Sequence, residues 1–240
     1  AVAAIPEGLP AVVTIALALG VQRMVKRHAL IRKLPSVETL GCATVICSDK
    51  TGTLTKNEMT VQAVYACDTL FKVTGIGYEP KGEFLLDEKA IDNEGFPDLI
   101  KTLKCGVLCN GAQLVKNNIS YKIFGDPTEG AILTCAAKAG LWKEKMEQEF
   151  SFVEEIPFDS ERKKMTIVRR GEDNKLIAFV KGAPDILLND CVGIEEKGQR
   201  RTLTSDDRGR ILKINSDLAN QALRVLAVGY RILDKAPDKY

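Results

Sequence analysis

One short run of β-branched residues constrains the fold of this chain more than any other feature. Residues 43–47 read Ala-Thr-Val-Ile-Cys, as expected of a strand buried on both faces of a parallel sheet. Asp49 follows at the carboxyl end of this strand, where open α/β sheets place their ligands. The run therefore predicts an α/β element with an acidic side chain at its ligand-binding edge.

The segment that follows this strand carries the strongest chemical signal in the chain. Residues 47–55 read Cys-Ser-Asp-Lys-Thr-Gly-Thr-Leu-Thr. A carboxylate at a strand end can attack a phosphoryl group and form an acyl phosphate. The next turn can offer backbone N–H groups, hydroxyls and an ammonium group to that phosphate, from Lys50, Thr51, Gly52 and Thr53. An Asp in a β-turn before a glycine is also a common structural feature, which is the alternative interpretation.

The N-terminal stretch predicts part of a membrane helix. Residues 1–22 are apolar apart from Glu7, and basic side chains follow between positions 23 and 33. The run from Ala11 to Val21 is shorter than the about 20 residues that span a bilayer. We interpret it as the second half of a spanning helix, with the cytoplasm downstream under the positive-inside rule. A buried helix of a soluble domain fits the apolar residues equally well, and the basic flank favours the membrane.

Two prolines surround the single charge of this stretch, in the run Pro6-Glu7-Gly8-Leu9-Pro10. Proline removes a backbone donor and interrupts helical hydrogen bonding, so carbonyl groups near Glu7 are freed. Such irregular backbone survives at membrane depth only where it is buried in protein or lines a polar cavity. A carboxylate beside freed carbonyls suits a hard cation such as Ca²⁺, so Glu7 is a candidate cation ligand.

The texture changes after about residue 67, where short strand and helix patterns alternate between Gly and Asn turns. This predicts an α+β domain built on an antiparallel sheet flanked by helices and inserted after the first strand of the α/β element. We expect strands at 59–66, 69–74, 83–86, 120–124, 164–170, 175–181 and 225–232. Helices are expected at 97–110, 127–139, 184–190 and 205–222. Asp126 and Ser36 are expected to cap helices that run to Ala139 and Gly41.

Composition excludes several other classes. Lys and Arg number 34 against 32 Asp and Glu, without the basic excess of a nucleic-acid-binding protein. The seven cysteines contain no Cys-x-x-Cys pair, and the single His28 cannot complete a usual zinc site. Cys105 and Cys109 lie one helical turn apart, where burial as free thiols is the favoured interpretation.

The segment Asp-Lys-Thr-Gly-Thr-Leu-Thr at 49–55 resembles the phosphorylation motif of P-type ATPases. The phosphorylation domain of that family is a Rossmann-like α/β domain of the haloacid dehalogenase superfamily. The resemblance implies that ATP phosphorylates Asp49 and that Asp49 and Thr51 bind Mg²⁺. Phosphatases of the superfamily carry a second Asp where this chain has Thr51. Without that acid/base group, hydrolysis of an acyl phosphate should be slow, as a pump needs.

Further motifs occur in the order expected of the family's nucleotide-binding domain. They include Gly125-Asp126-Pro127-Thr128-Glu129, Lys181-Gly182-Ala183-Pro184, and Phe158 at the position of an adenine-stacking ring. The resemblance implies ATP contacts from Thr128, Glu129, Phe158, Arg162, Met165, Lys181, Gly182, Arg224 and Leu226. Each of these residues has an ordinary structural interpretation when taken alone. Some calcium pumps have an Arg where this chain has Ser160, and Arg162 or Lys163 could take over its phosphate contact.

The run at 6–10 is most similar to the calcium-pump branch of the family. The resemblance implies that Glu7 binds the transported Ca²⁺, assisted by backbone carbonyls of Val2, Ala3 and Ile5. A manganese pump, or a pump for another cation, is the alternative because Mn²⁺ also accepts hard oxygen ligands.

The resemblance covers essentially the whole chain. It assigns 1–22 to a membrane helix, 23–40 to a cytoplasmic connection, 41–66 to the start of the phosphorylation domain, 67–233 to the nucleotide-binding domain and 234–240 to the return segment. We therefore expect a mostly cytoplasmic piece of an integral membrane pump, in the plasma membrane if bacterial. It would bind ATP without turnover. A soluble phosphohydrolase is the less favoured alternative, and no nucleic-acid partner is expected.

Overall fold

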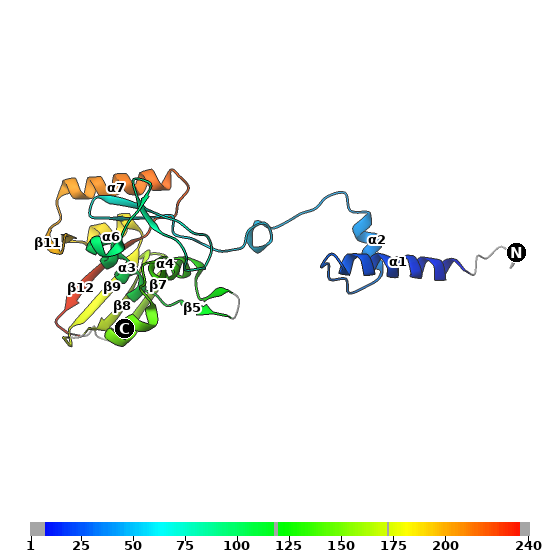
Figure 1. Cartoon of the computed structure of the whole chain (residues 1–240), viewed down its shortest axis with the longest axis horizontal. Coiled ribbons are helices and arrows are strands. Elements are labelled where there is room, and N and C mark those ends of the chain that lie inside the picture. Colours follow the sequence, from blue (N-terminus) through cyan, green and yellow to red (C-terminus); the bar gives the residue numbers. More distant parts are fainter. Residues whose placement is uncertain (1–7, 118–119, 172, 236–240) are drawn as a thin grey trace. The chain divides into compact units, whose positions relative to one another are not determined.

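The computed structural model describes residues 8–117, 120–171 and 173–235 (Figure 1). Its contacts divide the chain into two units, Ala1–Lys56 and Asn57–Tyr240. Residues 57–66 belong with the second unit because the strand at 63–66 pairs with the strand that follows it. The expected cation ligands Val2, Ala3, Ile5 and Glu7 lie outside the described residues.

The apolar stretch of the first unit forms α1 (Leu9–Val25). Pro10 lies in its first turn, where a proline sacrifices no helical hydrogen bond. The helix runs three residues past Gln22, the end of the predicted membrane segment, and none of its described side chains is buried. No helix among the described residues has the length and hydrophobicity needed to cross a membrane.

A second short helix, α2 (Pro35–Gly41), packs against α1. The packing is close, because a methyl group at Gly20 would lie 3.2 Å from Val37 Cγ1. We expected Ser36 to cap α2, but the helix begins at Pro35 and its N-cap is Leu34, two residues earlier. The fixed φ of proline suits the first helical position, which explains the earlier start.

The predicted strand at 43–47 is wrong. These residues form no strand, and Val45 and Ile46 are 76% and 87% exposed. A strand needs a neighbour that accepts and donates its backbone hydrogen bonds. No strand lies in the described part of the first unit, so this run has no partner there and the structure does not show the Rossmann-like α/β domain.

The second unit is organised by an antiparallel four-stranded sheet with the order β12-β9-β8-β7. Its strands are β7 (Ser151–Asp159), β8 (Lys164–Arg170), β9 (Leu176–Gly182) and β12 (Ala227–Leu233). The two central strands bury most of their side chains, whereas β7 at the sheet edge is largely exposed. β7 is therefore an edge strand that is exposed to solvent.

Two helices supply much of the remaining core. α3 (Pro97–Leu108) buries Leu99, Leu103 and Val107, which follow one another at the four-residue spacing of a single helix face. α4 (Pro127–Lys138) packs against α3, and α3 also contacts β9 and β12 (Figure 1). Through its contacts with α3, α4 is held against the sheet.

A second four-stranded sheet has the order β1-β2-β3-β4 and contacts α3. It consists of β1 (Ala63–Ala66), β2 (Thr69–Val73), β3 (Phe84–Leu86) and β4 (Lys89–Ala90). Phe71 and Phe84 are almost wholly buried, and the Phe71 ring meets Phe96 edge-on with centroids 5.1 Å apart. These aromatic side chains bury the sheet against the helical layer.

Short elements complete the second unit. They are the hairpins β5 (Gln113–Lys116) with β6 (Tyr121–Phe124) and β10 (Gly193–Glu196) with β11 (Gln199–Thr202), together with η3 (Asn93–Gly95), α5 (Lys143–Glu149), α6 (Pro184–Asp190) and α7 (Ser205–Ala219). The predicted α+β architecture of antiparallel sheets and helices is confirmed for this unit. The strands β4, β5, β7, β10 and β11 and the helix α5 were not predicted.

Candidate functional site

A partly buried ion pair connects α4 with the end of β9. Lys181 Nζ lies 2.8 Å from Glu129 Oε1, and the two side chains are only 7% and 15% exposed. Charges are placed in such surroundings only when they are paired and hydrogen-bonded, because burial removes their hydration. The sequence separation of 52 residues means that only the tertiary fold brings them together.

The position of Glu129 follows from the way α4 begins. Asp126 caps the helix as predicted, accepting hydrogen bonds from the backbone N–H groups of Thr128 at 2.8 Å and Glu129 at 3.3 Å. Burial by itself would raise the pKa of Asp126. Hydrogen bonds from the Thr128 hydroxyl and from the two backbone N–H groups outweigh burial, so its pKa lies below the ordinary value.

The position of Lys181, the partner of Glu129, follows from the register of β9 with its neighbouring strands. Gly182 lies beside Ala227 on one side and Lys164 on the other. A methyl group at Gly182 would lie 2.6 Å from the Lys163 carbonyl oxygen, so a larger residue would push β8 and β9 apart. Met165 is paired with Lys181 in the same register and is buried.

Phe158 lies at this end of the sheet, one residue before the pairing of Asp159 with Lys164. Its side chain is 63% exposed, although large aromatic side chains usually bury most of their surface. Asp159 orders the adjoining turn by accepting the backbone N–H of Arg162 at 2.9 Å. The Arg162 guanidinium donates to the Pro157 carbonyl at 2.8 Å and so lies back along β7.

The segment before β12 reaches the same helix start. Arg224 Nη1 donates to the Thr128 hydroxyl at 3.2 Å, and that hydroxyl in turn lies 3.4 Å from Met59 Sδ. Leu226 is the residue immediately before β12, and it is 36% exposed. The structure therefore brings Thr128, Glu129, Lys181 and Arg224 into one connected group, with Gly182 and Met165 adjoining it on the strands.

The Asp49 segment belongs to the first unit and is exposed throughout. Residues Lys50–Leu54 form one wide turn, and Gly52 adopts φ = 74°, a conformation that glycine accepts without strain. Thr55 donates from its backbone N–H and its hydroxyl to the Lys50 carbonyl, at 3.1 and 3.2 Å, and so closes the turn. Within the described residues, no three His, Cys, Asp or Glu side chains are grouped as a metal site.

Two contacts to Glu129 were not predicted from the sequence. The Gly111 backbone N–H donates to Glu129 Oε1 at 3.3 Å, and the Asn110 side-chain amide donates to the Glu129 carbonyl at 3.0 Å. Asn110 is 1% exposed, so its amide is buried in this contact. The Asn-Gly pair after α3 is a turn signal in the sequence, but nothing in the pattern indicates which residue it would meet.

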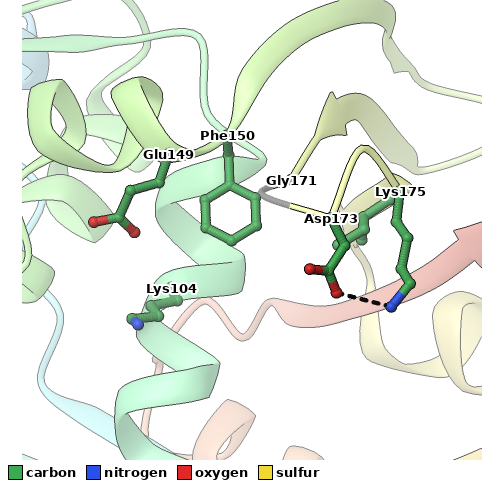
Figure 2. A pocket seen from close by; sticks show the side chains of 7 residues that line it. Lys104, Glu149, Phe150, Gly171, Asp173 and Lys175 are labelled. Carbon is green, nitrogen blue, oxygen red and sulfur yellow. Dashed lines mark hydrogen bonds and ion pairs between the residues drawn. The ribbon is translucent and has the colours of Figure 1, made fainter.

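A separate pocket of about 340 Å³ opens at the other end of the sheet, beside the turn between β8 and β9 (Figure 2). It is lined by Lys104, Glu149, Phe150, Gly171, Asp173, Lys175 and Ile177. Lys175 and Asp173 are paired at 2.9 Å within it. None of the residues proposed from the sequence lines this pocket.

Comparison with known proteins shows the family to which the chain belongs. A family model described as P-type ATPase, cytoplasmic domain N, matches residues 98–240. The chain therefore belongs to the P-type ATPase family, and the resemblance inferred from the motifs is confirmed.

The chain is also similar to individual cation-transporting ATPases. The chain is 49% identical over 231 residues to a calcium-transporting ATPase of Bacillus subtilis, covering 96% of this chain and 26% of the relative. It is 47% identical to the cation-transporting ATPase pma1 of a Synechocystis strain, covering 98% and 26%. It is 45% identical to the human calcium-transporting ATPase type 2C member 1, covering 95% and 25%. The chain thus spans about a quarter of the length of these relatives.

Proposed function

We propose that this chain is the ATP-binding and phosphorylated segment of an ATP-driven cation pump whose cargo is Ca²⁺. The observation that carries this proposal is the connected group of Thr128, Glu129, Lys181 and Arg224, at the end of the sheet where Phe158 is exposed. An exposed ring beside fixed cations is suited to a ligand with a flat base and an anionic tail. ATP is such a ligand.

Each residue of this site has a role in holding the nucleotide. Phe158 stacks on the adenine, and Gly182 lets the base approach the backbone closely. Lys181 lines the base pocket, where Glu129 holds its ammonium group. Arg224 meets the phosphates, for which a guanidinium provides paired donors. Met165 and Leu226 add apolar lining, and Arg162 supplies a further cation.

In the proposed reaction, a carboxylate oxygen of Asp49 attacks the γ-phosphorus, and the bond from phosphorus to the bridging oxygen of ADP breaks. ADP leaves with the electron pair, and an acyl phosphate remains. Asp49 and Thr51 offer the oxygen ligands that Mg²⁺ prefers, and the ion, when bound, would neutralise the transferred group. Thr51 cannot act as a general base, so water is not activated and the acyl phosphate persists.

The cargo site proposed for the parent protein involves Glu7 with the carbonyls of Val2, Ala3 and Ile5. Two of the relatives are named calcium-transporting, and the run around Glu7 has the hard oxygen donors that Ca²⁺ prefers. A pump for Mn²⁺ would use the same donors. The parent would be an integral membrane protein with this segment on the cytoplasmic side, and it would lie in the plasma membrane if the source is bacterial.

ATP binding is tested by titrating this chain with ATP and following its amide resonances. Phe158→Ala should weaken binding about tenfold, because stacking on an aromatic ring contributes about 1–3 kcal/mol per base. Phe152→Ala is the matched control, since Phe152 lies on the same strand and is 59% exposed. Equal effects of the two substitutions would contradict the proposed adenine site.

Phosphorylation is tested in the full-length parent with γ-³²P-labelled ATP. We expect acid-stable, hydroxylamine-sensitive labelling that requires Ca²⁺. The labelling should be absent in Asp49→Asn. In Glu7→Gln, the dependence of the labelling on Ca²⁺ should be weakened. Labelling of Asp49→Asn would refute the acceptor assignment. Labelling that responds to Mn²⁺ and not to Ca²⁺ would refute the proposed cargo alone.

A further inference from the structure

The loop of residues 110–112, which follows α3, contacts Glu129 through its backbone and through the Asn110 side chain. Gly111 donates its backbone N–H to Glu129 Oε1, the same oxygen that Lys181 binds. Asn110 anchors the loop twice, because its amide donates to the Glu129 carbonyl and its Oδ1 accepts the Ala112 N–H at 2.9 Å. The orientation of Glu129 therefore depends on where this loop lies.

One lysine, Lys143 of α5, holds the loop through two hydrogen bonds. Lys143 Nζ donates to the carbonyl oxygens of Asn110 and Ala112, each at 2.8 Å, and so brackets Gly111. The Lys143 side chain is only 12% exposed. Burial lowers its pKa. Burial of an ammonium group is costly unless it is hydrogen-bonded, and the carbonyls of Asn110 and Ala112 supply these hydrogen bonds, which ties the position of the loop to Lys143.

Lys143 is itself held by a second group of charges. Glu147 Oε1 lies 3.7 Å from Lys143 Nζ and 3.0 Å from Arg169 Nη2. Arg169 is 2% exposed and donates to the Leu108 carbonyl at the end of α3, at 2.8 Å. These contacts make a continuous polar path from α5 and β8 to the loop and on to Glu129.

We propose that Lys143 is a positioning residue for the nucleotide site, acting through the 110–112 loop to hold Glu129 and thereby Lys181. This inference rests on the proposed ATP site. Lys143 touches neither Lys181 nor the exposed ring of Phe158 in the contacts above, so its effect on ATP must pass through Glu129. Without its ammonium group, two carbonyls lose their donor and Gly111 is free to move away from the carboxylate.

The test is a double-mutant cycle in this chain, with the dissociation constant for ATP measured by titration. Lys143→Met keeps the methylene packing and should raise the constant about three- to tenfold, within the range of coupling between contacting residues. In a Glu129→Ala background the same substitution should change nothing, because its target is gone. An equal factor in both backgrounds, or no effect in either, would overturn the inference.

Lys138→Met is the matched control. Lys138 is also a partly buried lysine with a lowered pKa, and its Nζ donates to the Thr74 carbonyl at 2.6 Å. It should alter stability without coupling to Glu129. If Lys143→Met does not fold, Lys143→Arg, which keeps the charge but alters the donor geometry, replaces it in the same cycle.

The amide resonance of Gly111 separates this inference from the proposed function. Lys143→Met should shift it and Lys138→Met should not, with or without ATP. If the wild-type chain fails to bind ATP, the proposed function fails while this resonance still reports whether Lys143 holds the loop. If ATP binds and the Gly111 resonance is unmoved by Lys143→Met, the inference fails alone.

Discussion

At the scale of single residues, the environment decides what each side chain can do. Glu129 and Lys181 are nearly buried and paired, whereas Phe158 is exposed at the same end of the sheet. Gly182 is required there because neighbouring backbone occupies the space of a side chain. Residue type alone does not separate these roles, since Phe152 on the same strand is similarly exposed and other lysines, such as Lys101, also pair with a carboxylate.

Gly182→Ala should destabilise the second unit by about 2 kcal/mol, because its methyl group would overlap the Lys163 carbonyl. Gly209→Ala is the matched control, since nothing lies within 4 Å of a methyl group there. It should stabilise helix α7 by about 0.5–1 kcal/mol. Urea unfolding of the two variants measures both changes. Similar effects from both would contradict the close approach of β8 and β9.

The cysteines should differ in their reactivity toward iodoacetamide according to their burial. Burial raises the pKa of Cys105 and Cys135 to about 12 and that of Cys109 to about 11. Since the thiolate is the reactive species, these three should resist iodoacetamide at pH 8 in the folded chain. Cys42 and Cys47 are exposed and should react first. Mass spectrometry of digests reports each site, and early labelling of Cys135 would contradict its burial.

At the scale of elements, capping and strand pairing determine where helices and strands begin and end. Thr204 and Asp207 form a capping box at the start of α7. Asp207 also accepts hydrogen bonds from Arg201 at 2.9 Å and from Arg210 at 2.8 Å. This carboxylate therefore joins the helix to the hairpin of β10 and β11, where Arg201 lies.

Asp207→Asn should lower the melting temperature at neutral pH more than Asp206→Asn does. The hydrogen bond from Arg201, followed by those from the Thr204 backbone and hydroxyl, holds the pKa of Asp207 well below its ordinary value. A depressed pKa contributes stability above the unfolded value of about 3.9, and that stability is lost as pH falls through the lower folded value. The difference between wild type and Asp207→Asn should therefore shrink below about pH 4.

Asp206 is the control because it lies in the same first turn and is exposed. It shares any interaction with the helix dipole but lacks the arginine contacts given for Asp207. Thermal unfolding followed by circular dichroism between pH 3 and 8 compares the variants. A gap that stays constant with pH would contradict the role given to the Asp207 carboxylate.

At the scale of the whole molecule, the two units differ in what they bury. The second unit contains the buried core residues, from Phe71 and Leu99 to Ile167 and Phe179. The helices of the first unit bury none of their described side chains. Stability should therefore reside in residues 57–235, because burial of apolar surface is the main favourable contribution to folding.

A chain of residues 57–235 should fold and melt within a few degrees of the full chain. Its ATP affinity should be unchanged, since the proposed nucleotide contacts all lie within it. Hydrogen exchange offers an independent check, because the exposed residues 43–47, which form no strand, should exchange at once and β8 and β9 slowly. A truncated chain that is unfolded would contradict this division.

Local pattern was enough for much of the second unit. The cap at Asp126, the helices α3, α4 and α6 and the strands β8 and β9 were predicted from neighbouring residues, because each has its own periodicity and punctuation. Strand β7 was missed because it alternates poorly and is exposed along much of its length. The hairpin of β10 and β11 was missed because its charged residues have no apolar face to reveal it.

The sequence by itself determined the motifs and the local elements that carry them, including the family to which they belong. It could not determine the strand at 43–47, since a strand exists only with a partner and none is present in the described first unit. Only the tertiary structure decided that Glu129 meets Lys181, and that Lys143 reaches the 110–112 loop. Such contacts join residues far apart in sequence, and their energy depends on burial that no local pattern contains.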